Sequence, residues 1–405
     1  LMGLAEAHRW RGDWASLLNA VEQATAVADQ IGDVRLLGRA ASAMTIGALW
    51  RSAPAGQVNE DVVAALRRSL AELPAADDPL RSRVMLALAN ELHYGATFEE
   101  RTALVEQALA MARRLDHPGA VMDAALVGFM ALWRPDTAEQ RLDLATEAMA
   151  IASTLGAERS FTVAATLTAV AHGELGQVQQ MGETGALARD YAERLRIPYG
   201  VMVLDALEVP WLAMAGRFAE AEQRLESVAL LAERMQVHEV GEALAAVAMA
   251  LRLWQGRVDE VLPDVLGGDE GSDPLAALQC LLLLRAGRLD QAREHLATHP
   301  VVLDPVDTFS LLNWSAAAET ALAVGDRDLG AAAYTLLAPY AGRCACAGPS
   351  MALGPVDAFL ALAAAASGEV ALAVRHADDA RALTEQWRIP LAAQWLDGQR
   401  ERFGF

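Results

Sequence analysis

The residues of this sequence that could carry chemistry are few, and the closest pair is made of cysteines. Cys344 and Cys346 lie one residue apart, a spacing that could hold a metal ion or a redox couple. A tetrahedral zinc site needs four ligands, and Cys280, the one remaining cysteine, does not complete the set. We therefore interpret Cys344 and Cys346 as structural residues.

A pair of histidines forms the second group. His295 and His299 are one helical turn apart, as the zinc ligands of metalloprotease helices are. In those helices a glutamate directly follows the first histidine, whereas Leu296 stands there in this chain and Pro300 ends the segment. We interpret the pair as exposed histidines at the end of a helix. The sequence predicts no metal site and no cofactor.

Lysine is absent from the chain. All 33 basic residues are arginine, against 53 Asp and Glu, and the formal net charge is −20. Without lysine there is no Walker A loop, no kinase strand lysine and no pyridoxal Schiff base. We also find no Gly-x-Ser-x-Gly elbow and expect no strand that could present a phosphate-binding loop. The net charge argues against direct binding of nucleic acid, and we predict that the protein is not an enzyme.

The composition favours helices from end to end. Of 405 residues, 85 are alanine and only 5 are isoleucine. A chain of this length would usually split into domains, unless each unit buries its apolar face on the next. We find no membrane-spanning run and no signal peptide, and the few cysteines indicate a reducing, cytoplasmic setting. The chain begins inside a helix-like pattern at Leu1, so we expect it to be part of a larger protein.

A short turn signal recurs along the chain at a nearly constant interval. Gly176, Gly216 and Gly256 are 40 residues apart, and Ala112, Ala152 and Ala192, each preceded by an apolar residue, follow the same interval. A third marker lies two positions before each turn, at Trp10, Trp50, His93, Trp133, Glu174, Met214 and Trp254. Three markers with one period predict a repeated unit of helix, turn and helix.

We therefore predict an all-α fold, a right-handed superhelix of about nine or ten antiparallel helix pairs. Residues 1–266 and 275–405 carry the repeats, and the acidic, Gly-rich stretch 267–274 is a joint between them or a bend within one continuous superhelix. Residues 342–355 are too many for a simple helix turn, and we expect this loop to be functional or to form a docking surface.

Two segments resemble the centre of a tetratricopeptide repeat (TPR). Residues 216–225 and 287–296 match it at the turn glycine, at the small residues Ala221 and Ala292, and at the apolar residue that ends each segment. Other units depart from the pattern, and the period is longer than the usual 34 residues. Alanine is replaced in those units by Leu17, Met181 and Val261.

The longer period resembles the sensor regions of large bacterial ATP-dependent transcription regulators. Residues 340–357 and 366–376 are similar to the terminal repeats of LuxR-type regulators, SARP-type antibiotic-regulatory activators and some nucleotide-cyclase fusions of high-GC bacteria. The resemblance implies that a STAND-class NTPase domain and a DNA-binding or cyclase domain lie elsewhere in the same polypeptide. It implies an effector, either a small molecule or a protein or peptide, and no direct contact with nucleic acid or membrane.

By analogy with the TPR, the third marker faces the concave side of the superhelix and forms a candidate binding surface. The alternative is that these side chains pack between adjacent units as core. The candidate residues are Trp50, His93, Trp133, Met214 and Trp254, with Met85, Met122 and Phe129 as further apolar lining.

A second candidate interrupts an apolar helix with two acids and a proline. Asp205, Glu208 and Trp211 could bind a cationic group in a pocket opened by Pro210. The alternative is that the acids contact arginines of a neighbouring unit. Asn313 and Trp314 are a further candidate of the same kind. The predicted function is effector sensing by a change in superhelix curvature, and the alternative is a scaffold that binds a peptide or helix of a partner.

Overall fold

The computed structural model describes residues 1–45, 47, 49, 57–235, 240–266, 275–304 and 306–405, so Trp50 and the predicted joint 267–274 lie outside the described residues. The described chain is all-α, as predicted, with 21 α-helices and one small hairpin of two strands. No helix in the described part is both long and apolar enough to cross a membrane.

The helices follow one another with short connections. Their bounds are α1 Met2–Arg11, α2 Trp14–Ile31, α3 Val34–Ala41, α4 Glu60–Glu72, α5 Pro79–Glu91, α6 Phe98–Arg114, α7 Pro118–Ala131, α8 Ala138–Leu155, α9 Glu158–Glu174, α10 Val178–Arg194, α11 Pro198–Met214, α12 Phe218–Met235, α13 Val240–Trp254, α14 Leu262–Leu266, α15 Ala276–Arg285, α16 Leu289–Thr298, α17 Ser310–Val324, α18 Arg327–Leu337, α19 Val356–Ser367, α20 Val370–Trp387 and α21 Pro390–Phe403. Short 3₁₀ turns are η1 Ala43–Thr45, η2 Pro135–Thr137, η3 Val258–Glu260 and η5 Ala338–Tyr340. The strands are β1 Cys344–Ala347 and β2 Met351–Pro355.

The turn glycines of the repeat adopt the left-handed conformation that ends a helix. Glycine has no Cβ to clash there, so its amide can bond the last carbonyls of the helix without strain. The seven positions, with positive φ between 69° and 87°, are Gly12, Gly176, Gly216, Gly256, Gly287, Gly325 and Gly368. The sequence therefore places these helix ends correctly.

The other turn of the unit uses a left-handed glycine at Gly32 and Gly156 and a left-handed residue that is not glycine at three further positions. Asp116, Arg196 and Arg388 have φ of 47°, 55° and 57°, and each stands two residues before a proline that begins the next helix. Proline fits the first helical position, because its missing amide hydrogen would have no partner there. The two kinds of turn alternate, so the chain reverses at each one.

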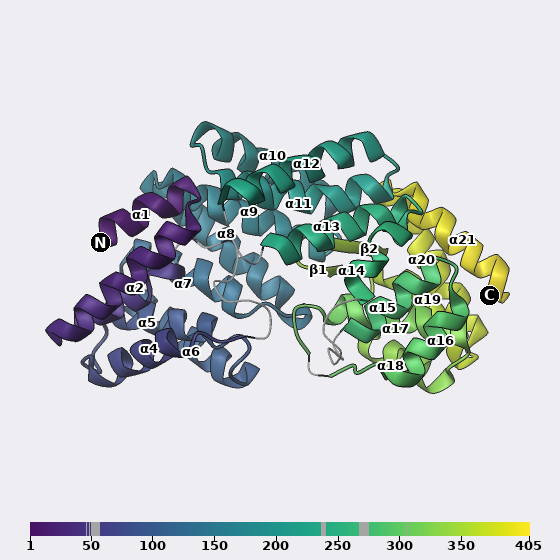
Figure 1. The fold of residues 1–405 in the computed structure, drawn as a ribbon, viewed down its shortest axis with the longest axis horizontal. Helices are drawn as coiled ribbons and strands as arrows, with labels where there is room; N and C mark the ends of the chain where they lie inside the picture. The colour runs from purple at the N-terminus through teal and green to yellow at the C-terminus, as the bar shows by residue number, and fades with distance from the viewer. Residues whose placement is uncertain (46, 48, 50–56, 236–239, 267–274, 305) are drawn as a thin grey trace.

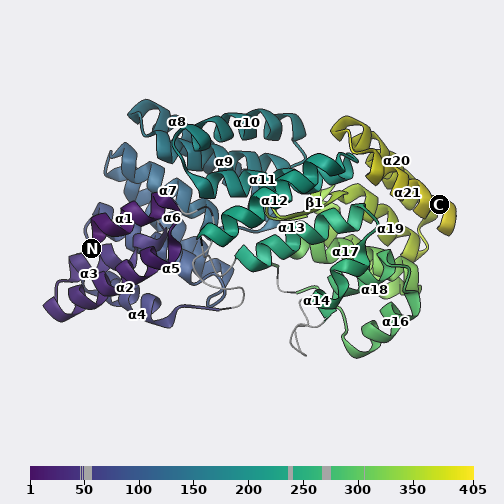
Figure 2. The same cartoon turned by 45° about the horizontal axis from the view of Figure 1, so that its top comes forward.

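Helices pack on their neighbours in sequence and on the helix two further along. Thus α9 contacts α8 and α10 on either side and α11 beyond, and α11 contacts α13. In the middle of the chain, α9, α11 and α13 pack one on the next and are called here the inner layer, while α8, α10 and α12 pack beside them. This part lies between the first helices of the chain and its C-terminal helices (Figures 1 and 2). Each inner helix contacts one of the two strands, so the hairpin lies against the inner layer.

The hairpin corrects the expectation that the chain contains no strand and that residues 342–355 form a loop. β1 pairs antiparallel with β2, with an irregularity between Cys344 and Cys346, and all four residues of β1 and all five of β2 are buried. A buried irregular loop would leave backbone amide and carbonyl groups without hydrogen-bond partners, whereas the pairing of two strands provides those partners. The small side chains of Cys-Ala-Cys-Ala allow that pair of strands to fit between helices.

One hydrophobic core runs through most of the molecule. Its buried residues extend from Leu49 to Leu396, so the regions on either side of residues 267–274 share the same core. The first helices form a smaller cluster with Leu17 at its centre, and Trp14 packs edge-on against Tyr199, 4.9 Å between ring centroids.

Candidate functional site

The candidate site is built on the marker residues that lie near the ends of α5, α7, α9, α11 and α13. We call these five side chains the inner face: His93, Trp133, Glu174, Met214 and Trp254. All five are less than a tenth exposed, because the C-terminal region, residues 275–405, covers them. The inner face is therefore an intramolecular contact and not an open lining.

The start of the C-terminal region contacts the first two inner-face residues. The hydroxyl of Thr308 lies 3.5 Å from Nε2 of His93 and donates a hydrogen bond of 3.2 Å to the Trp133 carbonyl. The hairpin turn follows, where a Cβ placed on Gly348 would lie 3.6 Å from the Trp133 ring. Before the hairpin, Arg343 donates to the Pro135 carbonyl at 2.7 Å.

The end of the C-terminal region contacts the last two inner-face residues. A Cβ on Gly354 of β2 would lie 3.9 Å from the sulfur of Met214. Trp254 meets Trp395 of α21 edge-on, with 6.5 Å between ring centroids. The C-terminal region thus spans successive units that the sequence places 40 residues apart.

A buried ion pair lies at the centre of the inner face. Arg141 of α8 is 0% exposed and pairs with the Glu174 carboxylate, which also accepts a 2.9 Å hydrogen bond from Trp133 Nε1. The Arg141 guanidinium lies 5.0 Å from the Phe129 ring centroid and 5.2 Å from that of Trp133. Charge pairing and cation–π contacts together offset the cost of burying both charges.

The two strand cysteines lie beside this ion pair and are free thiols. A hydrogen bond with Cys344 and complete burial raise the pKa of Cys346 well above its usual value, and the negative charge of Glu174 adds to the shift. A thiol with a raised pKa is a poor nucleophile and a poor metal ligand, because both roles need the thiolate.

The acids of the second candidate are paired with arginines. Asp205 and Glu208 on α11 lie 2.8 Å and 3.0 Å from Arg189, and Arg224 of α12 pairs with both. Burial lowers the pKa of Arg189, but the two carboxylates outweigh it and raise the pKa overall. Helix α11 continues through Pro210. Of the two alternatives for Asp205 and Glu208, the structure contains the ion pairs with arginines of neighbouring helices.

The remaining candidates are mostly interior residues. Trp211 packs edge-on against Trp387 at 5.6 Å between ring centroids, and Trp314 Nε1 donates to the Leu303 carbonyl at 3.0 Å. Asn313 is half-buried beside it. The candidates buried in the main core are Met85, Met122, Phe129, Trp211 and Trp314.

Residues that the sequence analysis missed supply the cover of the inner face. Trp395 of α21 contacts Trp254 of the inner face, Trp387 of α20 packs beside it on Trp211, and Arg141 neutralises Glu174. Neither tryptophan stands at a marker position of the 40-residue repeat. This departure from the repeat was the signal in the sequence that could have singled them out. Nothing in its local sequence distinguishes the buried Arg141 from arginines that lie on the surface.

Two shallow hollows lie away from the inner face, at equivalent turns of the repeat. They measure 380 and 350 Å³ and are lined by the Arg-Ile-Pro turns at 388–390 and 196–198. Their matching positions indicate that they follow from the way helices separate at this turn.

No family model and no curated protein matches this chain. The function of this chain is therefore inferred from the geometry of the inner face.

Two groups remain that could hold a metal by residue type. His295 and His299 are half-buried and stacked, with ring centroids 4.5 Å apart, and His295 bonds to Gln279 at 2.8 Å. Burial, with a smaller contribution from His299, lowers the pKa of His295. Among the described residues, one trio of ligand-type side chains also comes together, at α19 and α20.

Proposed function

We propose that this chain is a TPR-like α-solenoid that acts as a regulatory sensor module in the cytoplasm, without catalysis of its own. It would belong to a large bacterial transcription regulator whose NTPase domain and DNA-binding or cyclase domain lie elsewhere in the polypeptide. An effector molecule or a partner protein would change how the C-terminal region is held on the inner face.

One observation carries this proposal. The marker positions, repeated every 40 residues, meet the chain's own C-terminal region along several successive units. A surface built for intramolecular docking has two states, docked and released, and a ligand that prefers one of them shifts the population. A ligand that binds the inner face must compete with the C-terminal region docked there. Its apparent affinity equals its affinity for the released state multiplied by the fraction of molecules in that state.

Two buried carboxylates, one on the inner face and one on α11, support binding over catalysis. Glu174 and Asp205 are both buried and both paired with arginine, so neither carboxylate is placed to take a proton from a substrate. The packing of each helix on its sequence neighbours supports the solenoid, since such contacts let curvature change gradually along the array.

Tryptophan fluorescence tests the sensor directly. The chain is titrated with a panel of small metabolites, and a true effector gives saturable quenching that is reduced in Trp133→Phe and in Trp254→Phe. Trp14→Phe is the control, because Trp14 packs on Tyr199 and not on the C-terminal region. The proposal is abandoned if the intact gene product carries no NTPase, DNA-binding or cyclase domain.

The net charge of −20 favours a second function, a scaffold for a basic partner. In this case arginine-rich helical peptides, rather than metabolites, give the saturable fluorescence change. Binding of such peptides would weaken steeply with added salt because the attraction is between exposed charges. A response to neither class of probe counts against both functions.

A further inference from the structure

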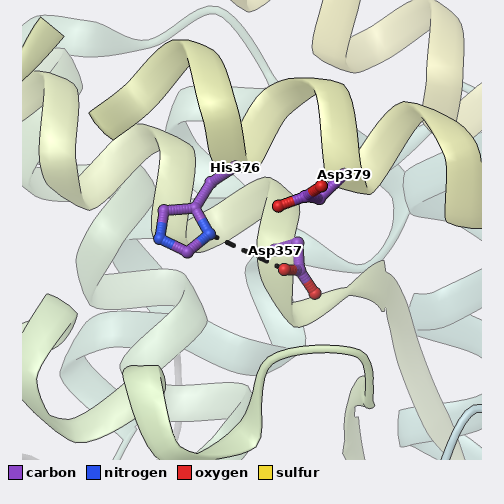
Figure 3. A group of neighbouring side chains, drawn as sticks. All are labelled: Asp357, His376 and Asp379. Atoms are coloured by element: carbon purple, nitrogen blue, oxygen red, sulfur yellow. Dashed lines mark ion pairs between the residues drawn. The ribbon is translucent and has the colours of Figure 1, made fainter. Parts of the chain in front are cut away.

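Three side chains outside the inner face meet where α18, α19 and α20 pack together. Asp357 lies in the first turn of α19, and His376 and Asp379 lie one turn apart on α20. Asp357 and Asp379 stand 11 residues before and 11 residues after Gly368, which ends α19, so the helix hairpin brings them level. Both α20 side chains point toward Asp357 (Figure 3), and one ligand atom of each lies within 4.8 Å of the others.

The spacing inside the trio suits a shared ion better than a hydrogen bond. Nδ1 of His376 is 3.6 Å from Oδ1 of Asp357, which is too long for a nitrogen-to-oxygen hydrogen bond. That nitrogen is buried and has no hydrogen-bond partner among the described residues. Two ligands of one tetrahedral ion, with bonds of about 2.0–2.2 Å, lie about 3.3 Å apart. Asp379 is exposed, and its ligand oxygen lies within 4.8 Å of the other two ligand atoms.

Two further contacts orient the trio. Nε2 of His376 is 3.1 Å from the Tyr334 hydroxyl, and when it donates to that oxygen the lone pair is on Nδ1, facing Asp357. The Gly342 amide donates to Oδ2 of Asp357 at 2.6 Å and leaves Oδ1 toward His376. Outer contacts of this kind orient the ligands in metal sites.

The charge of the trio is unusual for this protein. The buried carboxylates of Glu174, Asp205 and Glu319 each pair with an arginine. Asp357 is 4% exposed, and within the described part of the chain no arginine pairs with it. A divalent cation would neutralise the two carboxylates of the trio, and this is the compensation that a buried carboxylate requires.

We propose that Asp357, His376 and Asp379 bind a divalent first-row transition-metal ion, with water completing its coordination on the exposed side of Asp379. An imidazole nitrogen favours later first-row ions such as cobalt, nickel and zinc over magnesium, calcium and manganese, which prefer oxygen ligands. The site differs from the expectation that the chain binds no metal, because its ligands come from two helices and form no short motif. It does not depend on the proposed sensor function.

Cobalt(II) is the probe for this site. Tag-free, full-length chain is freed of metal by dialysis against EDTA and titrated with Co²⁺, while visible d–d absorption and isothermal calorimetry are recorded. We expect one ion per chain, displaced by Zn²⁺ and not by millimolar Mg²⁺. His376→Ala and Asp379→Asn each weaken Co²⁺ binding at least tenfold, and Tyr334→Phe weakens it less.

Two controls exclude other sources of binding. Asp378→Asn changes the neighbouring acid, which pairs with Arg400, and His299→Ala removes one of the stacked histidines. Both variants keep the affinity of the parent chain. Because Asp379 is exposed, Asp379→Asn remains folded even if His376→Ala does not, and circular dichroism verifies this. Absence of 1:1 binding in the parent, or binding that survives both ligand variants, overturns the proposal.

Discussion

Gly176→Ala is the sharpest perturbation of the contact between the inner face and the C-terminal region. Gly176 has φ of 71°, and an added Cβ would lie 2.5 Å from the Trp387 ring and 2.8 Å from the Gly342 carbonyl oxygen. Gly256 provides the matched control, with φ of 69° and no heavy atom within 4 Å of its added Cβ. Both substitutions impose the same backbone strain, and only Gly176→Ala forces the two regions apart.

The expected magnitudes follow from these two terms. A left-handed alanine costs about 1–2 kcal/mol of unfolding free energy, and this is the whole cost of Gly256→Ala. Crowding of a packed contact costs a further 1–3 kcal/mol, roughly, at Gly176, because a backbone carbonyl and the buried Trp387 ring cannot both move away freely.

The assay is urea unfolding followed by circular dichroism at 222 nm, together with amide hydrogen exchange of residues 344–355. We expect Gly176→Ala to lose more stability than Gly256→Ala and to exchange its hairpin amides faster, whereas Gly256→Ala leaves hairpin exchange unchanged. Equal stability losses with identical hairpin exchange would refute the contact as we describe it.

Three further predictions follow from buried or paired groups. Arg141→Met removes the cation that pairs with buried Glu174 and should cost about 3–5 kcal/mol of unfolding free energy, measured by urea unfolding. Replacing both partners with methionine should cost less than the single change. A hydrogen bond from Arg252 lowers the pKa of the Glu222 carboxylate. The stabilisation that this ion pair gives the folded state is therefore present above the usual pKa near 4.5 and is lost as the pH falls through the lowered value. The difference in unfolding free energy between the parent and Glu222→Gln should shrink from pH 7 to pH 3. Burial raises the pKa of Cys280 to about 11, so a maleimide at pH 8 should modify it more than roughly 100-fold slower than a free cysteine, and modification at the free rate would contradict its burial.

Much of the local structure could be predicted from the sequence. The turn glycines end helices in the left-handed conformation, and prolines such as Pro118 and Pro198 begin them, because these effects depend on a few adjacent residues. The third marker also predicted that these side chains face a concave binding surface, and ligand binding there stays a prediction. What these side chains meet in the C-terminal region was not predictable, because those partners are more than 100 residues away in the chain.

The hairpin shows why the remainder was missed. Cys-Ala-Cys-Ala lacks the alternation of polar and apolar residues that would predict a strand. The segment forms a strand because it is buried between helices, where its amide and carbonyl groups find their hydrogen-bond partners by pairing with β2. The trio of Asp357, His376 and Asp379 was missed for a related reason. Two of its members share a helix face, but the third joins them only when α19 folds back on α20.

The sequence by itself determined the helical class, the positions of many turns and their period, and it contains no lysine for a Walker A loop or a Schiff base. These properties depend on composition and on interactions between near neighbours. Only the tertiary structure decided that the C-terminal region covers the inner face and that Arg141 neutralises Glu174. Such contacts join segments far apart in the chain, and their free energy comes from burial and charge pairing that arise only when those segments meet.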